Sequence, residues 1–250
     1  MGQLNPLEAT AKLVVVQSTK LTVIGTAFAY RNKSHYLTAS HCIPRYEKFE
    51  LVIVPTNFPA LEGAAWVEKV DHHPTADLAV LTVRFQSELP IRPFVDIAIP
   101  RLGDDYVAFG FPAEAVLKGA TRPTPRLFKG NYQRFFEHTS HMKYTYYAAE
   151  LSAPCPDGLS GGPLFHRPSE GRVAGLVTES LQVATVLDEE VKVTADGATE
   201  RTEYRNVINY GVAVLLHPLA GWLAEMIPVR ESVGSKLLSI LSRAPLRRRP

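Results

Sequence analysis

Cysteine is nearly absent from this chain, because only Cys42 and Cys155 occur among its 250 residues. At most one disulfide bond can form, so a small secreted scaffold held by several disulfides is excluded and two reduced thiols are the simpler interpretation. Long apolar runs are also lacking. The longest run, residues 211–216, ends at His217-Pro218 and falls well short of the roughly 20 residues that cross a bilayer.

An excess of charge of one sign is missing as well. The chain has 27 lysines and arginines against 25 aspartates and glutamates, a net charge of +2. This balance does not indicate nucleic acid or an anionic surface as the main partner. The amino-terminal residues show no basic stretch leading into an apolar segment, so no secretory signal is visible. We therefore expect a cytoplasmic protein that binds no nucleic acid and no membrane.

Apolar residues and turn formers are plentiful. Hydrophobic residues make up 46% of the chain and charged residues 21%, which is enough apolar material to bury a substantial core. The 16 glycines and 19 prolines are scattered along the chain. They favour many short elements joined by turns and argue against a helical bundle.

Short runs rich in Val, Ile, Thr and aromatic residues predict two consecutive β units. The first unit comprises residues 13–16, 21–30, 36–38, 51–54, 64–70 and 78–83. The second comprises residues 106–109, 126–136, 144–151, 163–165, 173–178, 181–187 and 206–216. Proline-containing residues 87–100 are interpreted as a linker, and the charged residues 188–205 as a solvated hairpin extension with a turn at Asp196-Gly197. Helices are predicted at 219–227 and 229–243.

Three short strings contain residue types that can carry chemistry. YLTASHC (residues 36–42) places His41 just after an apolar strand, and ADLAVL (residues 76–81) opens an apolar strand with Asp77. GLSGGPL (residues 158–164) surrounds Ser160 with glycines, which favour close backbone approach or unusual dihedral angles. Taken singly, each string has a structural explanation as a turn, a cap or a core histidine. Their joint occurrence predicts a nucleophile with its base and an orienting acid.

The three strings resemble those of the chymotrypsin-like serine peptidases. The second string resembles the bacterial Deg (HtrA) branch more than the digestive enzymes. The resemblance covers roughly residues 13–227. It implies an all-β fold of two six-stranded antiparallel β-barrels followed by C-terminal helices. Residues 1–96 would form the first barrel and residues 97–216 the second, with residues 217–250 as closing helices and basic tail.

The resemblance also implies a function, that of a serine endopeptidase acting on protein or peptide substrates through an acyl-enzyme. His41 would be the general base, Asp77 would orient its imidazole, and Ser160 would be the nucleophile. The backbone N–H groups of Gly158 and Ser160 would form the oxyanion hole. The order His, Asp, Ser argues against an α/β-hydrolase, in which the order is Ser, acid, His. No cofactor is expected, and a regulatory partner is left open.

Two alternatives to a free-standing enzyme remain open. One is a non-catalytic adaptor that uses the two-barrel scaffold as a binding module. The other is a protease domain that is gated by a neighbour in a larger protein.

Two positions depart from the digestive members of the family. Leu159 stands where those enzymes have an aspartate that pairs with a newly cut amino terminus, so activation by trimming is not expected. Any regulation is expected to move residues 153–159 instead. Pro154 stands where trypsin itself is acidic, so cleavage after Arg or Lys is not favoured. The resemblance implies a mostly neutral substrate pocket for apolar or small side chains, lined by Pro154, Cys155, Thr178, Ser180 and Ala213.

Several other residues receive a structural interpretation. Cys42 is interpreted as a buried thiol that faces Ile24 on the preceding strand, with pairing to Cys155 left open. Asp157 and Glu179 are interpreted as solvated charges at the pocket rim. No metal site is expected, because no ligand spacing accompanies the histidines at 72, 73, 138 and 141. Basic and aromatic residues between 118 and 143 could bind single-stranded nucleic acid, but a β-hairpin with one solvated face is favoured.

Overall fold

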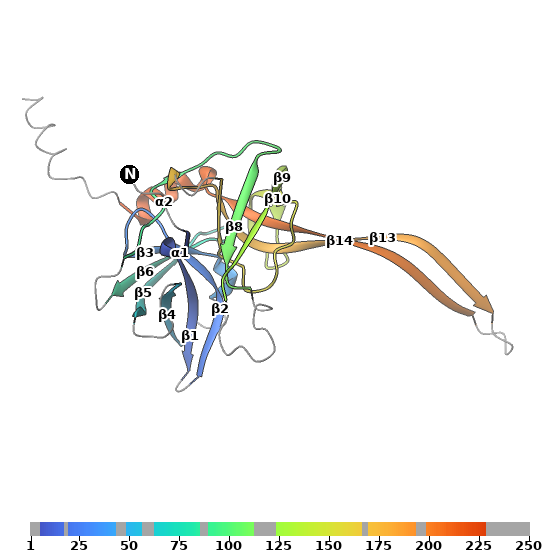
Figure 1. Cartoon of the computed structure of the whole chain (residues 1–250), viewed down its shortest axis with the longest axis horizontal. Helices are drawn as coiled ribbons and strands as arrows, with labels where there is room; N and C mark the ends of the chain where they lie inside the picture. Colours follow the sequence, from blue (N-terminus) through green and yellow to red (C-terminus); the bar gives the residue numbers. More distant parts are fainter. Residues whose placement is uncertain are drawn as a thin grey trace, which may run out of the picture.

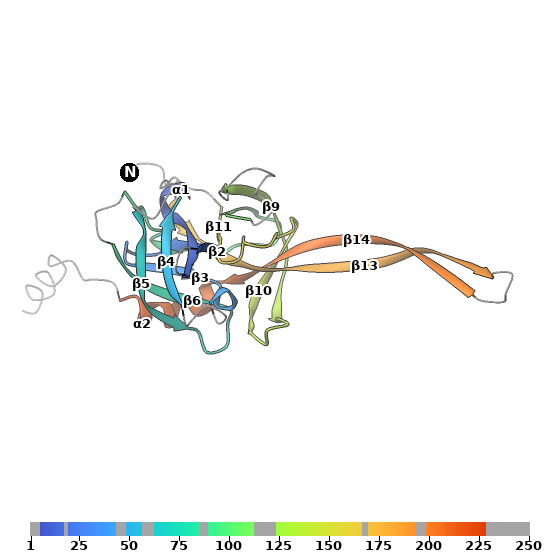
Figure 2. The ribbon, with the colours of Figure 1, turned by 90° about the horizontal axis from the view of Figure 1, so that it is seen from below.

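The computed structural model describes residues 6–17, 20–43, 49–56, 63–85, 90–112, 124–166, 170–193 and 199–228. These residues are almost entirely β-structure with a few short helices, which confirms the predicted all-β class. Figure 1 shows a body built from two groups of strands, from which one long two-stranded arm projects. Figure 2 shows the same arm from below.

The first group is a closed barrel, with the strands in the order β1-β2-β3-β6-β5-β4. Its strands are β1 (Thr10–Gln17), β2 (Lys20–Ala29), β3 (His35–Thr38), β4 (Glu50–Pro55), β5 (Ala65–His72) and β6 (Ala79–Phe85). Each of the first six predicted runs falls on one of them. The short helix α1 (Pro6–Ala9) precedes the barrel, and the 3₁₀ helix η1 (Ser40–Cys42) follows β3. Large apolar side chains fill the interior and are fully buried, among them Leu13, Phe28, Leu37, Ile53 and Leu81.

The second group is a hydrogen-bonded ring, with the strands in the order β10-β14-β13-β11-β8-β9. Its strands are β8 (Asp105–Gly110), β9 (Arg126–Thr139), β10 (Thr145–Leu151), β11 (Pro163–Phe165), β13 (Gly175–Val193) and β14 (Thr199–Leu215). The predicted division between residues 173–178 and 181–187 is wrong. Residues 175–193 form one continuous strand, whose register with β14 shifts between Val177 and Glu179.

The arm, defined here as residues 181–193 and 199–210, consists of the outer parts of β13 and β14. The two strands pair from Leu181 and Tyr210 out to Val193 and Thr199, with a second register shift between Val186 and Asp188. The hairpin extension was predicted only for residues 188–205, so the arm starts nearer the body than expected. The predicted turn at Asp196-Gly197 lies outside the described residues.

Residues 87–100, which were predicted as a linker, lie between the two groups of strands. Their described part contacts both groups. The Phe94 backbone accepts a hydrogen bond from Arg31 N at 2.6 Å and donates one to Ala29 O at 3.0 Å. The Phe94 ring also packs between Phe28 and Phe165, with ring centroids 5.6 Å away in both cases. Short strands β7 (Asp96–Ile97) and β12 (Arg172–Val173) then pair in parallel. The contacts predict that the two groups move as one body.

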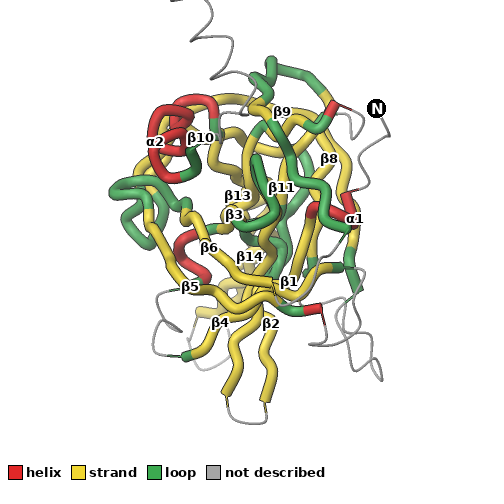
Figure 3. Tube along the Cα trace, turned by 90° about the vertical axis from the view of Figure 1, so that its left-hand side faces the viewer, coloured by secondary structure: helices red, strands yellow, loops and turns green. Residues whose placement is uncertain are grey.

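The described part of the chain ends with the 3₁₀ helix η6 (His217–Leu219) and the helix α2 (Ala220–Met226). The bounds of α2 agree closely with those of the helix predicted at 219–227. This region returns to the N-terminal barrel (Figure 3). Arg31 Nη1 donates to Ile227 O at 3.0 Å, and the Trp222 ring lies 4.9 Å from the His73 ring. The second predicted helix, 229–243, lies outside the described residues. None of the helices in the described residues is long and apolar enough to span a membrane.

Candidate active site

His41 and Asp77 are joined by two hydrogen bonds. His41 lies in η1 directly after β3, and Asp77 lies just before β6. Since β3 and β6 are neighbours in the barrel, with Thr38 paired to Ala79, their ends bring the two side chains together. His41 Nδ1 lies 2.6 Å from Asp77 Oδ2, and the His41 backbone N donates to Asp77 Oδ1 at 2.9 Å. These bonds fix the ring and leave Nε2 as the nitrogen that can act as a base.

The environment of His41 favours its protonated form. Burial of the ring opposes protonation, but the hydrogen bond to Asp77 and the neighbouring Cys42 sulfur outweigh burial and raise the pKa of His41 above its ordinary value. Asp77 itself is buried, with 2% of its surface exposed. A buried carboxylate that accepts two hydrogen bonds is well suited to stabilise a positive imidazolium.

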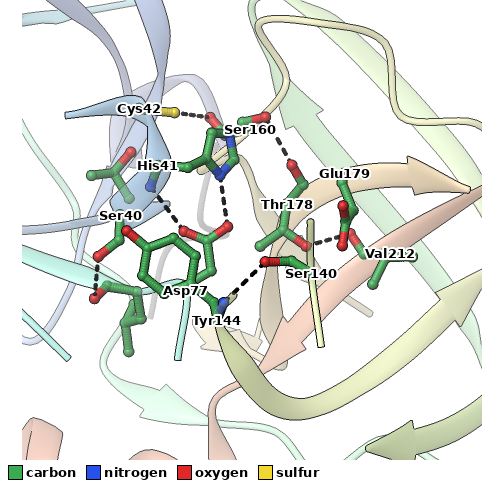
Figure 4. Close-up of polar contacts among 12 residues, drawn as sticks. Ser40, His41, Cys42, Asp77, Ser140, Tyr144, Ser160, Thr178, Glu179 and Val212 are labelled. Atoms are coloured by element: carbon green, nitrogen blue, oxygen red, sulfur yellow. Dashed lines mark hydrogen bonds and ion pairs between the residues drawn. The ribbon is translucent and has the colours of Figure 1, made fainter. Parts of the chain in front are cut away.

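Ser160 lies on the other side of the imidazole. Figure 4 shows the His41 ring between Asp77 and Ser160, and so the structure brings the three predicted residues to one place. The Ser160 hydroxyl donates to the backbone carbonyl of Thr178 at 3.1 Å. Among the hydrogen bonds of the described residues, none joins Ser160 Oγ to His41. Rotation of the serine side chain would be needed to form that bond.

In the loop around Ser160, the N–H groups of Gly158 and Ser160 have no acceptor among the described residues. The Leu159 N–H donates to Pro156 O at 3.1 Å, and the Gly162 N–H donates to Leu159 O at 2.8 Å. The Gly161 N–H donates to Val177 O at 2.8 Å. Gly158 has φ of +85°, a left-handed conformation that glycine adopts without strain. Backbone N–H groups without a protein acceptor are the kind of donor that an oxyanion hole needs.

Thr26 holds this loop in place and was missed in the sequence. It is fully buried on β2, its backbone N donates to Ser160 O at 2.8 Å, and its Oγ1 donates to Gly158 O at 2.9 Å. Thr38 Oγ1 in turn donates to Thr26 O at 2.7 Å. Thr26 therefore ties the nucleophile loop to the barrel that carries His41. The only local signal is the pair Gly25-Thr26, which interrupts the apolar run of residues 21–30.

The two cysteines are both free and buried, so they do not pair with each other. The residue that faces Cys42 is Gly25 rather than the expected Ile24, because a Cβ on Gly25 would lie 2.8 Å from Cys42 Sγ. Burial raises the pKa of the Cys155 thiol to about 12. This thiol is therefore protonated and chemically inert near neutral pH.

The residues predicted to line the substrate pocket are close together, with one exception. Ser180 Oγ accepts from the Cys155 backbone N at 2.9 Å and donates to the Cys155 backbone O at 2.8 Å. The Ser180 hydroxyl thus links β13 to the segment that contains Cys155. Thr178 and Ala213 are buried nearby, whereas Pro154 is exposed.

Glu179 is not the solvated rim charge that was expected. Its side chain is only 16% exposed and forms ion pairs with His138 Nε2 and with His141 Nδ1, the latter at 3.3 Å. Tyr146 OH lies 3.5 Å from the same carboxylate. The carboxylate is therefore engaged by residues of β9, β10 and the turn between them. Asp157 is exposed, in line with its interpretation as a solvated charge.

Among the remaining histidines and basic residues, His73 and Arg134 have structural partners. No group of three or more His, Cys, Asp or Glu side chains among the described residues could hold a metal ion. His73 Nδ1 accepts from the Ala76 backbone N at 2.9 Å and so caps the bend before Asp77. In the predicted basic and aromatic stretch, Arg134 pairs with Glu150 at 2.7 Å and lies 4.4 Å over the Phe136 ring. Lys118 and Arg122 of that stretch lie outside the described residues.

The sequence of the chain matches a known family over residues 25–176, which is more than half of its length. The description of this family is trypsin-like peptidase domain. The chain belongs to the trypsin-like peptidase family. This membership confirms the predicted resemblance and the predicted enzyme class, a serine-type endopeptidase. No curated protein matches the sequence significantly.

Solved structures of bacterial proteases share the fold of this trypsin-like peptidase. The active form of the Rv3671c protease from M. tuberculosis is 18% identical, with a TM-score of 0.59, and the match covers 92% of this chain and 85% of that one. The MamO protease domain from Magnetospirillum magneticum is 15% identical, with a TM-score of 0.60 and coverage of 86% and 96%. The HtrA-type protease AlgW with a tripeptide is 18% identical, with a TM-score of 0.57 and coverage of 90% and 61%.

Proposed function

We propose that this trypsin-like peptidase hydrolyses peptide bonds of protein or peptide substrates, with Ser160 as nucleophile, His41 as general base and Asp77 as the residue that orients the base. The observation that carries the proposal is the doubly hydrogen-bonded His41–Asp77 pair, whose imidazole lies next to Ser160. The raised pKa of His41 supports this role, because the imidazolium formed during catalysis is then stabilised.

The proposed reaction uses only groups of the chain and water. Ser160 Oγ attacks the scissile carbonyl carbon while its proton passes to His41 Nε2, and the carbonyl oxygen becomes an oxyanion held by the N–H groups of Gly158 and Ser160. The C–N bond then breaks, and Nε2 returns the proton to the leaving amine. Water attacks the resulting acyl-enzyme by the same route and releases the carboxylic acid and free Ser160.

The residues of the predicted pocket support a small or apolar side chain at the residue before the cleaved bond. No acidic group lies at the predicted base of the pocket, where Pro154 stands, and the Ser180 hydroxyl is hydrogen-bonded to the Cys155 backbone. A long basic side chain would meet no counter-charge at that position. We therefore expect cleavage after residues such as alanine rather than after arginine.

One observation favours a second candidate, a gated protease or non-catalytic binding module. The resting Ser160 hydroxyl is bonded to Thr178 O and not to His41. In a gated enzyme this contact would persist until a partner changed the conformation of the loop.

Labelling with a fluorophosphonate probe decides between these functions. The wild-type chain should be labelled at Ser160, and Ser160→Ala should not be labelled and should lose about a millionfold in kcat. Thr178→Ser keeps the backbone carbonyl and a hydroxyl, so it serves as the matched control and should still be labelled. A wild-type chain that resists the probe under all conditions would instead support the binding module.

A further inference from the structure

One edge of β13 runs without interruption from the proposed active centre into the arm. Within the ring, β13 pairs with β14 on one side and with β11 on the other, at Gly175 and Leu176. On the β11 side the nucleophile loop follows next, where Val177 exchanges hydrogen bonds with Gly161 and Gly162 at 2.8 and 2.9 Å. Beyond Thr178, no described strand pairs with this side of β13 (Figure 1).

The first part of this free edge is uncharged and rich in residues that favour β-structure. Residues 180–187 read SLQVATVL and contain no charge, proline or glycine, and the facing residues 206–210 of β14 read NVINY. The exposed fractions of Val183, Val186 and Leu187 are 49%, 51% and 68%. Proteins ordinarily protect a free edge with lysine, proline or a covering segment. This part of β13 lacks such side chains and so is suited to accept another strand.

Several charges of the arm are paired within the arm itself. Glu189 pairs with Arg201 across the two strands at 3.5 Å, and Glu190 pairs with Lys192 at 3.5 Å along β13. Arg205 pairs with Glu203 on β14. These charged side chains therefore have ionic partners within the arm, whereas the uncharged strand segment of residues 180–187 has exposed apolar side chains and no charge of its own.

A two-stranded ribbon is only marginally stable in water, and a third strand with apolar contacts makes it considerably more stable. We propose that an extended polypeptide substrate supplies this third strand by pairing with β13 along residues 180–187. This inference rests on the proposed function. The continuity of the edge with the Ser160 loop argues for the substrate as occupant, because a chain held at Ser160 passes directly onto this edge. The enzyme thereby selects long, unfolded chains with uncharged residues on one side of the cleaved bond.

Internally quenched peptides with a common core test this selection. The core Val-Thr-Val-Ala-Ser-Ala is extended by eight residues of alternating Val, Thr and Gln, at its amino end in one peptide and at its carboxyl end in another. One of the extended peptides should be cleaved with a kcat/KM about tenfold above that of the core, which corresponds to a few additional strand hydrogen bonds.

Two shortened arms provide the variant and its matched control. The test variant lacks residues 184–207, with Val183 joined to Ile208 through Asn-Gly, because these two residues face each other across the strands. The control lacks residues 189–203, with Asp188 joined to Tyr204 in the same way, and so keeps the uncharged edge. The test variant should cleave core and extended peptides equally well, and the control should keep the tenfold preference.

A binding measurement separates this proposal from the proposed function. Ser160→Ala should bind the fluorescein-labelled extended peptide more tightly than the labelled core by fluorescence anisotropy, and removing residues 184–207 in that background should abolish the difference. Absence of a length preference in either assay would overturn the proposal while leaving fluorophosphonate labelling intact. If the arm pairs two copies of this chain instead, light scattering would show a dimer that becomes a monomer on shortening, with peptide preference unchanged, which would also overturn it.

Discussion

The hydroxyl of Ser160 donates to the backbone carbonyl of Thr178 at 3.1 Å. This bond ties the resting nucleophile to β13, the strand whose free edge continues into the arm. Before attack, the hydroxyl must leave this carbonyl and meet Nε2 of His41. A substrate backbone that donates a hydrogen bond to Thr178 O would compete for the same acceptor and so release the hydroxyl.

The raised pKa of His41 predicts the pH dependence of activity. The base must be neutral, so kcat/KM should be low in acid and should rise through an inflection above about 6.5, the ordinary value for histidine. Asp77→Asn removes interactions that raise this pKa, so the inflection should move down while kcat falls about ten-thousandfold. The measurement is kcat/KM of wild type and variant across the pH range.

Cys42→Ala is the matched control for this profile, because Cys42 also raises the pKa of His41 but takes no part in the reaction. It should lower the inflection while kcat at high pH stays close to the wild-type value. A wild-type inflection below about 6.5 would contradict the electrostatic description of the site.

Gly161→Ala should destabilise the fold far more than Gly103→Ala. Both glycines have φ of +82°, so alanine pays a similar backbone cost of about 1–2 kcal/mol at each. A Cβ on Gly161 would also lie 2.0 Å from Thr26 O and 2.3 Å from Thr38 Oγ1, whereas one on Gly103 meets nothing within 4 Å. Urea unfolding should show a further loss of about 2 kcal/mol or more at Gly161. Equal losses for the two variants would be evidence against the close fit of the nucleophile loop on Thr26.

Ser180→Gly should widen the preference at the residue before the cleaved bond. The change removes the hydroxyl that bridges the Cys155 N–H and C=O groups, and it opens space in the predicted pocket. Cleavage after leucine or phenylalanine should gain about tenfold relative to alanine, as expected for one or two additional methylene groups in a pocket. Ser180→Thr keeps the hydroxyl and should keep the wild-type preference. Profiling with a peptide library measures both, and a strong wild-type preference for arginine would contradict a neutral pocket.

The residues with local sequence signals were predictable. His41, Asp77 and Ser160 each stand in a short string whose composition reflects their surroundings, and each strand of the N-terminal barrel coincides with an apolar run. Thr26 was missed because its hydrogen bond to Gly158 joins residues 132 positions apart. Such a contact exists only after the barrel and the ring have packed together, so one strand cannot reveal it.

Two errors along β13 have physical causes of the same kind. The polar pair Glu179-Ser180 interrupts the apolar pattern and suggested the end of a strand, yet both residues are paired with β14. Glu179 was interpreted as solvated because its neighbours in the sequence give no counter-charge. Its partners His138 and His141 come from the β9–β10 region, about forty residues away.

Tyr146→Phe tests whether the hydrogen bond between Tyr146 on β10 and Thr178 holds β13 in position. Thr178 Oγ1 donates its single hydrogen to Val212 O at 3.1 Å, so the hydrogen of Tyr146 OH is shared between Thr178 Oγ1 at 3.0 Å and Glu179 Oε1 at 3.5 Å. Burial raises the pKa of Tyr146, which keeps the phenol protonated as a donor. Removing this hydroxyl should cost about 1–2 kcal/mol of unfolding free energy in urea. It should also lower kcat, because the carbonyl of Thr178 faces Ser160.

Tyr147→Phe is the control for that variant, because Tyr147 is adjacent and 40% exposed. Its hydroxyl has no hydrogen bond to any described residue, so its loss should leave stability and kcat nearly unchanged. If Tyr146→Phe proved as stable and as active as Tyr147→Phe, the hydrogen bond to Thr178 would have no role in holding β13. The position of Thr178 would then depend on its backbone contacts and on its bond to Val212 alone.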